Sequence, residues 1–183
     1  MENQQHPAQD RIAQGKIVQQ RGLYLDEMEV GALYRHAPGR TLTEADNVGF
    51  TTMTMNTQSL HLDAHWSSQQ QFGRPLMNSM LTLSTIVGAS VAQLTQGTIV
   101  ANLGFDTVKF PHPMYHGDTL YTEITVVDKR LSKSRQGQGV VQLQHIGRNQ
   151  DGVVVAECAR STMMWVSEEA HRLAEQQRTG DPS

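Results

Sequence analysis

The stretch from Asn78 to Leu94, NSMLTLSTIVGASVAQL, decides the fold of this chain, because its apolar residues recur at helical spacing. The remaining positions are mostly Ser, Gly and Ala, and a helix that is apolar on one side and small elsewhere is typically enclosed by other structure. We therefore expect one central helix with the rest of the domain around it. The helical spacing is set by Met80, Leu81, Leu83, Val87, Val91 and Leu94.

A period of two replaces the helical period downstream of this helix. Residues 119–131 alternate between apolar and polar, and residues 139–148 and 153–166 continue as two further predicted strands. The loop at 132–138 and the Asn-Gln-Asp-Gly turn at 149–152 join them closely. Such connections imply an antiparallel sheet, so the predicted fold class is α+β, with the sheet curled around the central helix. The inward face of the first strand is expected to carry Leu120, Thr122, Ile124 and Val126.

Two shorter elements are expected upstream of the central helix. Residues 33–40 are predicted to be extended, with a turn at residues 38–39. Thr43 is the predicted N-cap of a helix that reaches about Thr54, because Asp46 follows three residues later in a capping-box variant. The edge strands of the resulting sheet need a partner, which favours a dimer formed by extending the sheet.

The composition limits the class of protein. The 183 residues carry 15 Lys and Arg against 18 Asp and Glu, a net charge of −3, which argues against nucleic acid or an anionic membrane as the main partner. The single cysteine, Cys158, excludes an internal disulfide framework and favours a reducing compartment. Residues 1–16 lack the apolar run of a signal peptide, and residues 81–94 are too short to span a bilayer. We expect a soluble cytoplasmic protein.

The chain is expected to fold as one domain with an appendage at each end. A polar, Gln-rich N-terminal extension covers residues 1–21, the domain covers residues 22–167, and a charged C-terminal tail covers residues 168–183. No linker, repeat or low-complexity insert divides the central part, which supports the prediction of a single domain.

The polar loop at residues 56–63, NTQSLHLD, holds the first candidate for catalysis. Histidine is the commonest general acid or base near neutral pH, which makes His61 that candidate. The chain holds eight histidines, however, so a surface position without a catalytic role is the alternative. Asp63 would either orient the ring of His61 or simply end the loop.

Two further segments each allow a functional and a structural interpretation. Residues 73–80 run into the central helix, where free backbone N–H groups stabilise an oxyanion, or where Asn78 or Ser79 simply caps the helix. Residues 129–135 hold four cations and two hydroxyls, which suit phosphate groups or form a solvated hairpin tip. From the residues alone, the structural interpretation is favoured for both segments.

Other chemistries find no support in the sequence. His112 and His116 are four residues apart, but Pro111 and Pro113 flank the first and argue against a helical metal site. The sequence has neither a glycine-rich nucleotide motif nor a Gly-x-Ser-x-Gly motif, and Cys158 lies in the middle of a predicted strand. We therefore expect no metal and no cofactor.

The order of these segments resembles the MaoC-like enoyl-CoA hydratase/dehydratase family, whose members have the hot-dog fold. The resemblance covers about residues 23–166, and residues 43–46 are similar to the opening helix of that family. Residues 50–63 resemble its catalytic segment, T-G-D-x-N-P-L-H-x-D, and residues 72–80 resemble F-G-x-R-x-x-H-G-M at the entry to the central helix. The resemblance implies a single hot-dog domain.

Within that family, four stretches are most similar to mesaconyl-CoA hydratases (β-methylmalyl-CoA dehydratases) and related C5 acyl-CoA hydratases. Those hydratases are often longer chains with two hot-dog units, so the resemblance implies a homodimer of this single unit. The four stretches are residues 76–79, 101–106, 110–113, and 129–135 taken with the turn at 149–152.

The resemblance carries His61 over as the acid/base residue, whereas Asn56 stands where the family has Asp. An amide neither takes nor gives a proton near neutral pH, so Asn56 is expected to position water. Asn78 and Ser79 replace His-Gly, and Gln58-Ser59 replaces Asn-Pro. The backbone N–H of Ser79 would still stabilise the thioester enolate.

The resemblance therefore implies reversible hydration and dehydration of a short enoyl-CoA thioester, with a branched or dicarboxylic C4–C5 acyl group. An acyl-CoA thioesterase is one alternative, disfavoured because no Asp or Glu occurs between Asp63 and Asp106. A non-catalytic acyl-CoA-binding or partner subunit is the other, favoured by Asn56 and opposed by His61. The expected CoA-phosphate residues are Lys133 and Arg135, and the expected pocket residues are Phe72, Arg74 and His112, with His116 as a further cation for a second carboxylate.

Overall fold

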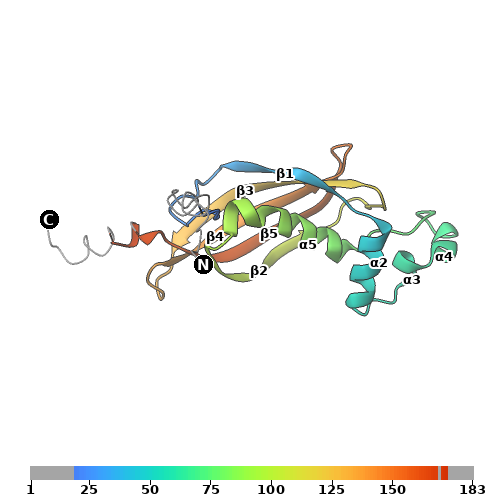
Figure 1. The fold of residues 1–183 in the computed structure, drawn as a ribbon, viewed down its shortest axis with the longest axis horizontal. Coiled ribbons are helices and arrows are strands. Elements are labelled where there is room, and N and C mark those ends of the chain that lie inside the picture. Colours follow the sequence, from blue (N-terminus) through green and yellow to red (C-terminus); the bar gives the residue numbers. More distant parts are fainter. Residues whose placement is uncertain (1–18, 169, 173–183) are drawn as a thin grey trace, which may run out of the picture.

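A long helix lies along one face of a five-stranded antiparallel sheet in the computed structural model, which describes residues 19–168 and 170–172 (Figure 1). In chain order the elements are β1 (Leu33–Thr41), α2 (Glu44–Met53), α3 (Ser59–Leu62), α4 (Ala64–Ser68), α5 (Ser79–Ser90), the π-helix η1 (Val91–Thr95), β2 (Ile99–Lys109), β3 (Thr119–Leu131), β4 (Gln138–Arg148) and β5 (Val154–Trp165).

The sheet has the strand order β1-β3-β4-β5-β2, and all four neighbouring pairs are antiparallel. The three strands predicted from the alternation are confirmed as β3, β4 and β5, and the predicted inward residues of β3 are buried. The edge strand β2 escaped prediction as a strand. Its pairing with β5 shifts register at three places and none of its residues is buried, so only the short alternation at Leu103 and Phe105 marks it in the sequence.

Strand β1 corrects the turn expected at residues 38–39. The chain continues through Pro38 and Gly39 to Thr41 as one strand, and the pairing with β3 shifts register there. Gly39 is required because a Cβ at this position would lie 2.5 Å from the ring of Tyr121. The glycine therefore marks a close approach between two strands, and the strand bulges where a turn was expected.

Helix α2 confirms the capping box, with the hydroxyl of Thr43 accepting from the N–H of Asp46 and the Asp46 carboxylate accepting from the N–H of Thr43. The predicted loop at 56–63 is only partly a loop, because α3 occupies residues 59–62. Helix α4 follows directly and was not predicted, since five residues are too few to display a period.

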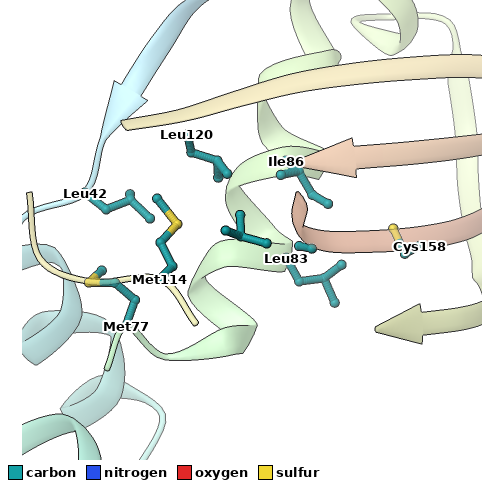
Figure 2. Packing of buried hydrophobic residues seen from close by; sticks show 9 residues of the cluster. Leu42, Met77, Leu83, Ile86, Met114, Leu120 and Cys158 are labelled. Carbon is teal, nitrogen blue, oxygen red and sulfur yellow. The ribbon is translucent and has the colours of Figure 1, made fainter. Parts of the chain in front are cut away.

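The central helix α5 buries one face against the sheet. Leu83 and Ile86 pack there against residues of the surrounding strands and loops, and truncating either side chain to Ala would cost roughly 2–5 kcal/mol (Figure 2). The expected enclosure of the whole helix is wrong, because Met80 is 51% exposed and Ser84, Gly88 and Ala89 are also exposed. The residues that form this core with Leu83 and Ile86 are Leu42, Met77, Met114, Leu120, Val155, Ala156 and Cys158.

The segment before β1 closes the end of the sheet that lies away from α2. Leu25 and Met28 are buried in a second core cluster, and the ammonium of Lys129 donates to the carbonyls of Leu25 and Asp26 at 3.2 Å and also to that of Met28. The predicted extension and tail lie largely outside the described residues, at 1–18 and 173–183. Within the described part of the chain, no helix is long and apolar enough to cross a membrane.

Candidate active site

The candidate site lies at the end of the sheet where α2, α3 and α4 project beyond the strands (Figure 1). The approach to α5 meets the loop between β2 and β3 there, through an antiparallel bridge between Leu76 and Tyr115 and a 2.8 Å hydrogen bond from the N–H of Met77 to the carbonyl of Met114. Three segments that are distant in sequence therefore meet around Leu76: α2, the stretch 56–63 and the loop before β3.

The ring of His61 is held in one orientation at this meeting point. Its Nδ1 lies 3.0 Å from the carbonyl oxygen of Leu76, and its backbone N–H donates to the carbonyl of Gln58 at 3.0 Å. A carbonyl can only accept, so Nδ1 carries the hydrogen and the neutral ring keeps its lone pair on Nε2. The side chain is half-buried. The sequence-predicted acid/base residue is therefore oriented with Nε2 as its basic atom.

Asn47, which the sequence analysis missed, joins the parts of the site. Its side chain is fully buried, and its Nδ2 lies 3.2 Å from the His61 carbonyl, 3.1 Å from the Leu76 carbonyl and 3.1 Å from Nε2 of His116. Its Oδ1 accepts from the N–H of Asn78 at 2.7 Å, which fixes the direction of the amide. Nε2 of His116 is therefore the acceptor in this contact.

A sequence signal for Asn47 did exist. Asn47 and Thr51 are four residues apart on α2, so they share one face of the helix, and both are fully buried. Thr51 accepts from Nδ2 of Asn78 at 3.2 Å. Buried polar side chains require partners, and a helix with a polar pair on its inward face therefore points to a hydrogen-bonded site.

Asn78 and Ser79, the two residues predicted at the start of α5, differ in whether their backbone N–H is free to bind a ligand. The N–H of Asn78 is taken by Asn47, and its side-chain oxygen accepts from the N–H of Met80 at 3.0 Å. Within the described residues, no hydrogen bond engages the N–H of Ser79. The Ser79 N–H lies at the positive end of a twelve-residue helix and is the donor left for an oxyanion.

The polar residues on either side of His61 shape the local backbone. Oδ1 of Asn56 accepts from the N–H of Gln58 at 3.0 Å and so stabilises the approach to α3, which leaves one lone pair of this oxygen for a further donor. Asp63 caps α4 by accepting from the N–H of Trp66 at 2.8 Å. The group that orients His61 is therefore the Leu76 carbonyl, and the carboxylate of Asp63 orients the next helix.

The predicted pocket residues lie at the same end of the molecule. The guanidinium carbon of Arg74 is 3.5 Å from the ring centre of Tyr115, which places this cation next to the bridge with Leu76. Nδ1 of His112 lies 2.9 Å from the carbonyl of Val154 at the start of β5. Phe72 is 38% exposed. None of the described His, Cys, Asp and Glu residues forms a group that could hold a metal ion.

The predicted CoA-phosphate residues, Lys133 and Arg135, lie at the other end of the sheet. They follow β3, whereas the bridge between Leu76 and Tyr115 precedes it (Figure 1). The 13 residues of β3 span roughly 40 Å at about 3.3 Å per residue. Within one chain, the structure therefore does not bring these two cations together with His61.

Comparisons with known proteins agree with this architecture. A family model described as MaoC like domain matches residues 27–149. The β-methylmalyl-CoA dehydratase of Chloroflexus aurantiacus is 29% identical over 143 residues, covering 78% of this chain and 40% of that protein. The mesaconyl-CoA hydratase of Cereibacter sphaeroides is 25% identical over 149 residues, covering 78% and 41%. The chain thus spans about two fifths of the length of these two relatives.

Among solved structures, a conserved hypothetical protein of Mycobacterium tuberculosis described as having a double hot-dog fold is 25% identical, with a TM-score of 0.72. The match covers 80% of this chain and 45% of that chain. The sheet, the helix along its face and this similarity together confirm the predicted α+β hot-dog fold.

Proposed function

The chain belongs to the MaoC-like domain family, and we propose that it catalyses the reversible hydration and dehydration of a short enoyl-CoA thioester. The observation that carries this proposal is the orientation of His61. Its ring is held by the Leu76 carbonyl with the lone pair on Nε2, three residues before the available N–H of Ser79. The segment that leads into α5 thus both orients the base and carries the oxyanion donor, and the addition of water to a conjugated thioester needs these two groups.

The proposed hydration uses one acid/base group. Nε2 of His61 takes a proton from water while the water oxygen bonds to the β-carbon, and the electrons of the double bond move to the thioester oxygen. The N–H of Ser79 and the positive end of α5 stabilise the enolate that forms. The protonated ring then returns its proton to the α-carbon, so water is added in full and His61 is regenerated. Dehydration follows the same steps in reverse.

Asn56 contributes to this reaction by position alone. Its side-chain oxygen already accepts from the N–H of Gln58, and the remaining lone pair accepts one hydrogen of the attacking water. Such positioning raises the rate through geometry without any transfer of charge. The proposal therefore assigns unequal roles to His61 and Asn56.

The proposed acyl group is branched or dicarboxylic with four or five carbons, because the two named relatives act on β-methylmalyl-CoA and mesaconyl-CoA. A second carboxylate needs a cation near the site. His116 accepts from Asn47 through Nε2, and Nδ1 of His112 is directed at Val154, which leaves Arg74 as the favoured partner. Stacking on Tyr115 holds this guanidinium in place without using its N–H groups.

The proposed working form is a homodimer in the cytoplasm. The edge strand β2 carries exposed Leu103, Phe105 and Val108, and the uncovered face of α5 carries exposed Met80. A second copy that extended the sheet at β2 would cover apolar surface that one chain leaves in water.

The test is turnover by the purified chain. Mesaconyl-, itaconyl- and crotonyl-CoA are each offered, and loss of the enoyl thioester absorbance is followed. Hydration of the first two in preference to crotonyl-CoA is expected if Arg74 holds a second carboxylate. Release of free thiol would replace the proposal with thioester hydrolysis. Tight binding without turnover would identify a binding or partner subunit, which the Asn at position 56 makes the natural alternative.

A further inference from the structure

A cavity of about 610 Å³ lies at the end of the sheet opposite His61. Three segments form its walls: the connection between β3 and β4, the segment before β1 at Leu25 and Asp26, and the chain after β5 at Val166, Ala170 and His171. This volume falls within the roughly 300–1,000 Å³ of typical small-molecule sites. The cavity is separated from the candidate active site by the length of β3.

The cavity collects cations in a chain whose net charge is negative. Among the described residues that line it are Lys129, Arg130, Lys133 and Arg135, against one carboxylate, that of Asp26, while Glu168 lines the adjoining hollow. That carboxylate is already engaged by Ser167, whose backbone N–H and hydroxyl donate to it at 2.8 and 2.7 Å. The electrostatic surroundings of the cavity therefore favour an anion.

The four cations differ in whether the protein itself already uses their N–H donors. Lys129 is used by the fold, since its ammonium donates to three carbonyls of the segment before β1. In the described part of the chain, no ion pair involves Arg130, Lys133 or Arg135. Three cations around one cavity are thus available to a ligand.

The loop that carries these cations is held in a defined conformation. The N–H of Arg135 donates to the hydroxyl of Ser132 at 3.1 Å, and the N–H of Val166 donates to the carbonyl of Gly137 at 2.9 Å. Gly137 has a φ of +68°, and a Cβ there would lie 2.7 Å from the ring of His171. The base of the loop is therefore fixed against the chain that follows β5, while residues 133–136 are exposed beside the cavity.

The remaining lining is apolar. Leu25, Leu131 and Val166 face the cavity, and an adjoining hollow of about 300 Å³ shares Gly137 and His171 with it and includes Trp165, which is 42% exposed. Apolar and aromatic surface beside unpaired cations suits a ligand with a flat ring and phosphate groups, because the ring packs on one part while the phosphates meet the other.

We propose that this cavity binds the phosphorylated end of an adenine nucleotide. Two sources have this chemistry: the 3′-phospho-ADP part of a CoA thioester that reacts at His61 of a second copy, and a free nucleotide that binds independently. Only the first source rests on the proposed function. The length of β3 between the two ends of one chain is the reason that a second copy is invoked.

The first test is a calorimetric titration of the full chain with adenosine 3′,5′-bisphosphate. Adenosine and inorganic phosphate are the matched probes that carry only the ring or only the charge. The bisphosphate is expected to bind more tightly than either. The paired substitution Lys133→Ala/Arg135→Ala should weaken its binding at least about tenfold, because it removes two charge-assisted donors.

The control removes the same charge elsewhere. Arg35 and Lys109 are exposed and pair with Glu123 and Glu157 away from the cavity. Arg35→Ala/Lys109→Ala should leave the affinity within about twofold, because it changes the net charge equally without touching the cavity. Gly137→Ala is a second, charge-neutral variant that should weaken binding by displacing His171, with a melting curve to confirm folding.

Kinetics then separate the two sources. KM is measured for a CoA thioester and for the matching pantetheine thioester, which lacks the nucleotide. If Lys133→Ala/Arg135→Ala raises KM for the CoA thioester only, and the control variant raises neither, the nucleotide belongs to the substrate. Weaker bisphosphate binding with an unchanged KM assigns it to a free nucleotide. Equal affinities in the cation variant and the control, or a bisphosphate no tighter than adenosine, would overturn the proposal. Absence of turnover would contradict the proposed function and leave the titration valid.

Discussion

The two ends of this molecule use polar groups in opposite ways. At the His61 end, a buried amide ties the elements together: Asn47 alone connects His61, Leu76, His116 and Asn78. At the end formed by the β3–β4 connection, three cations line a cavity without ion pairs in the described chain. Hydrogen-bonded side chains hold the fixed geometry that catalysis needs, whereas cations without ion pairs can bind a ligand of opposite charge.

The largest expected effect on catalysis is that of removing the side chain of His61. His61→Ala removes the group that exchanges protons with water and the α-carbon, so kcat is expected to fall by about 10²–10⁴. The matched control is His65→Ala, four residues later on exposed α4. Steady-state rates with one enoyl-CoA measure both. Comparable losses in the two variants would show that His61 holds no special position.

Asn56→Ala belongs beside that experiment as the graded comparison. It removes the positioning oxygen and leaves the proton-transfer group in place, so its loss in kcat should be smaller than that of His61→Ala. Asn56→Asp adds a negative charge near His61, which favours the protonated ring and weakens it as a base near neutral pH. Higher activity of Asn56→Asp at every pH would identify the site as a degraded acid/base pair.

The next effect tests whether engagement at the His61 end is structural. Asn47→Ala leaves the N–H of Asn78 without its buried acceptor and frees the carbonyls of His61 and Leu76, so we expect a loss of about 2–4 kcal/mol in the free energy of unfolding. Asn47→Asp keeps an acceptor for Asn78 but buries a carboxylate against the carbonyls of His61 and Leu76, so it should also destabilise. Denaturant unfolding should rank the wild type above both variants. An unchanged midpoint in both would remove Asn47 from its central role.

The next prediction concerns the pH dependence of stability, which depends on a histidine buried in the core between the two ends. Burial lowers the pKa of His145 to about 3, and the nearby charge of Arg160 adds to the effect. The unfolded chain takes up a proton at His145 below about pH 6.5 and the folded chain does not, so stability is complete above that pH and declines as the pH falls toward 3. The expected decline is about 1.4 kcal/mol for each pH unit.

Chemical denaturation at pH 7, 6, 5 and 4 measures this slope. His36, whose pKa burial also lowers despite a hydrogen bond with Gln93, contributes in the same direction. His145→Leu should flatten the profile, whereas His112→Gln on the exposed surface should leave it unchanged. A steep profile that survives His145→Leu would place the acid sensitivity elsewhere.

The sequence predicts the elements best where residues repeat with a period. The alternation of β3 to β5 and the capping box at Thr43 follow from local chemistry, and the structure confirms both. The irregular edge strand β2 and the exposed face of α5 depend on what lies beside them, which no local pattern encodes. His61 could be singled out by residue type, but its orientation depends on Leu76, fifteen residues away, through a backbone atom that every residue possesses.

The smallest expected effect compares, within one cluster, a cation that is hydrogen-bonded to the fold with two cations that have no ion pair in the described chain. Lys129→Ala removes the donor to three carbonyls and should lower the free energy of unfolding by about 1–3 kcal/mol. Lys133→Ala/Arg135→Ala removes two exposed cations without ion pairs in the described chain, so the change should stay within about 0.5 kcal/mol. Denaturant unfolding of the ligand-free protein compares the two. If the double substitution destabilised as much as Lys129→Ala, these cations would serve the fold, and the cavity would lose its claim to a ligand.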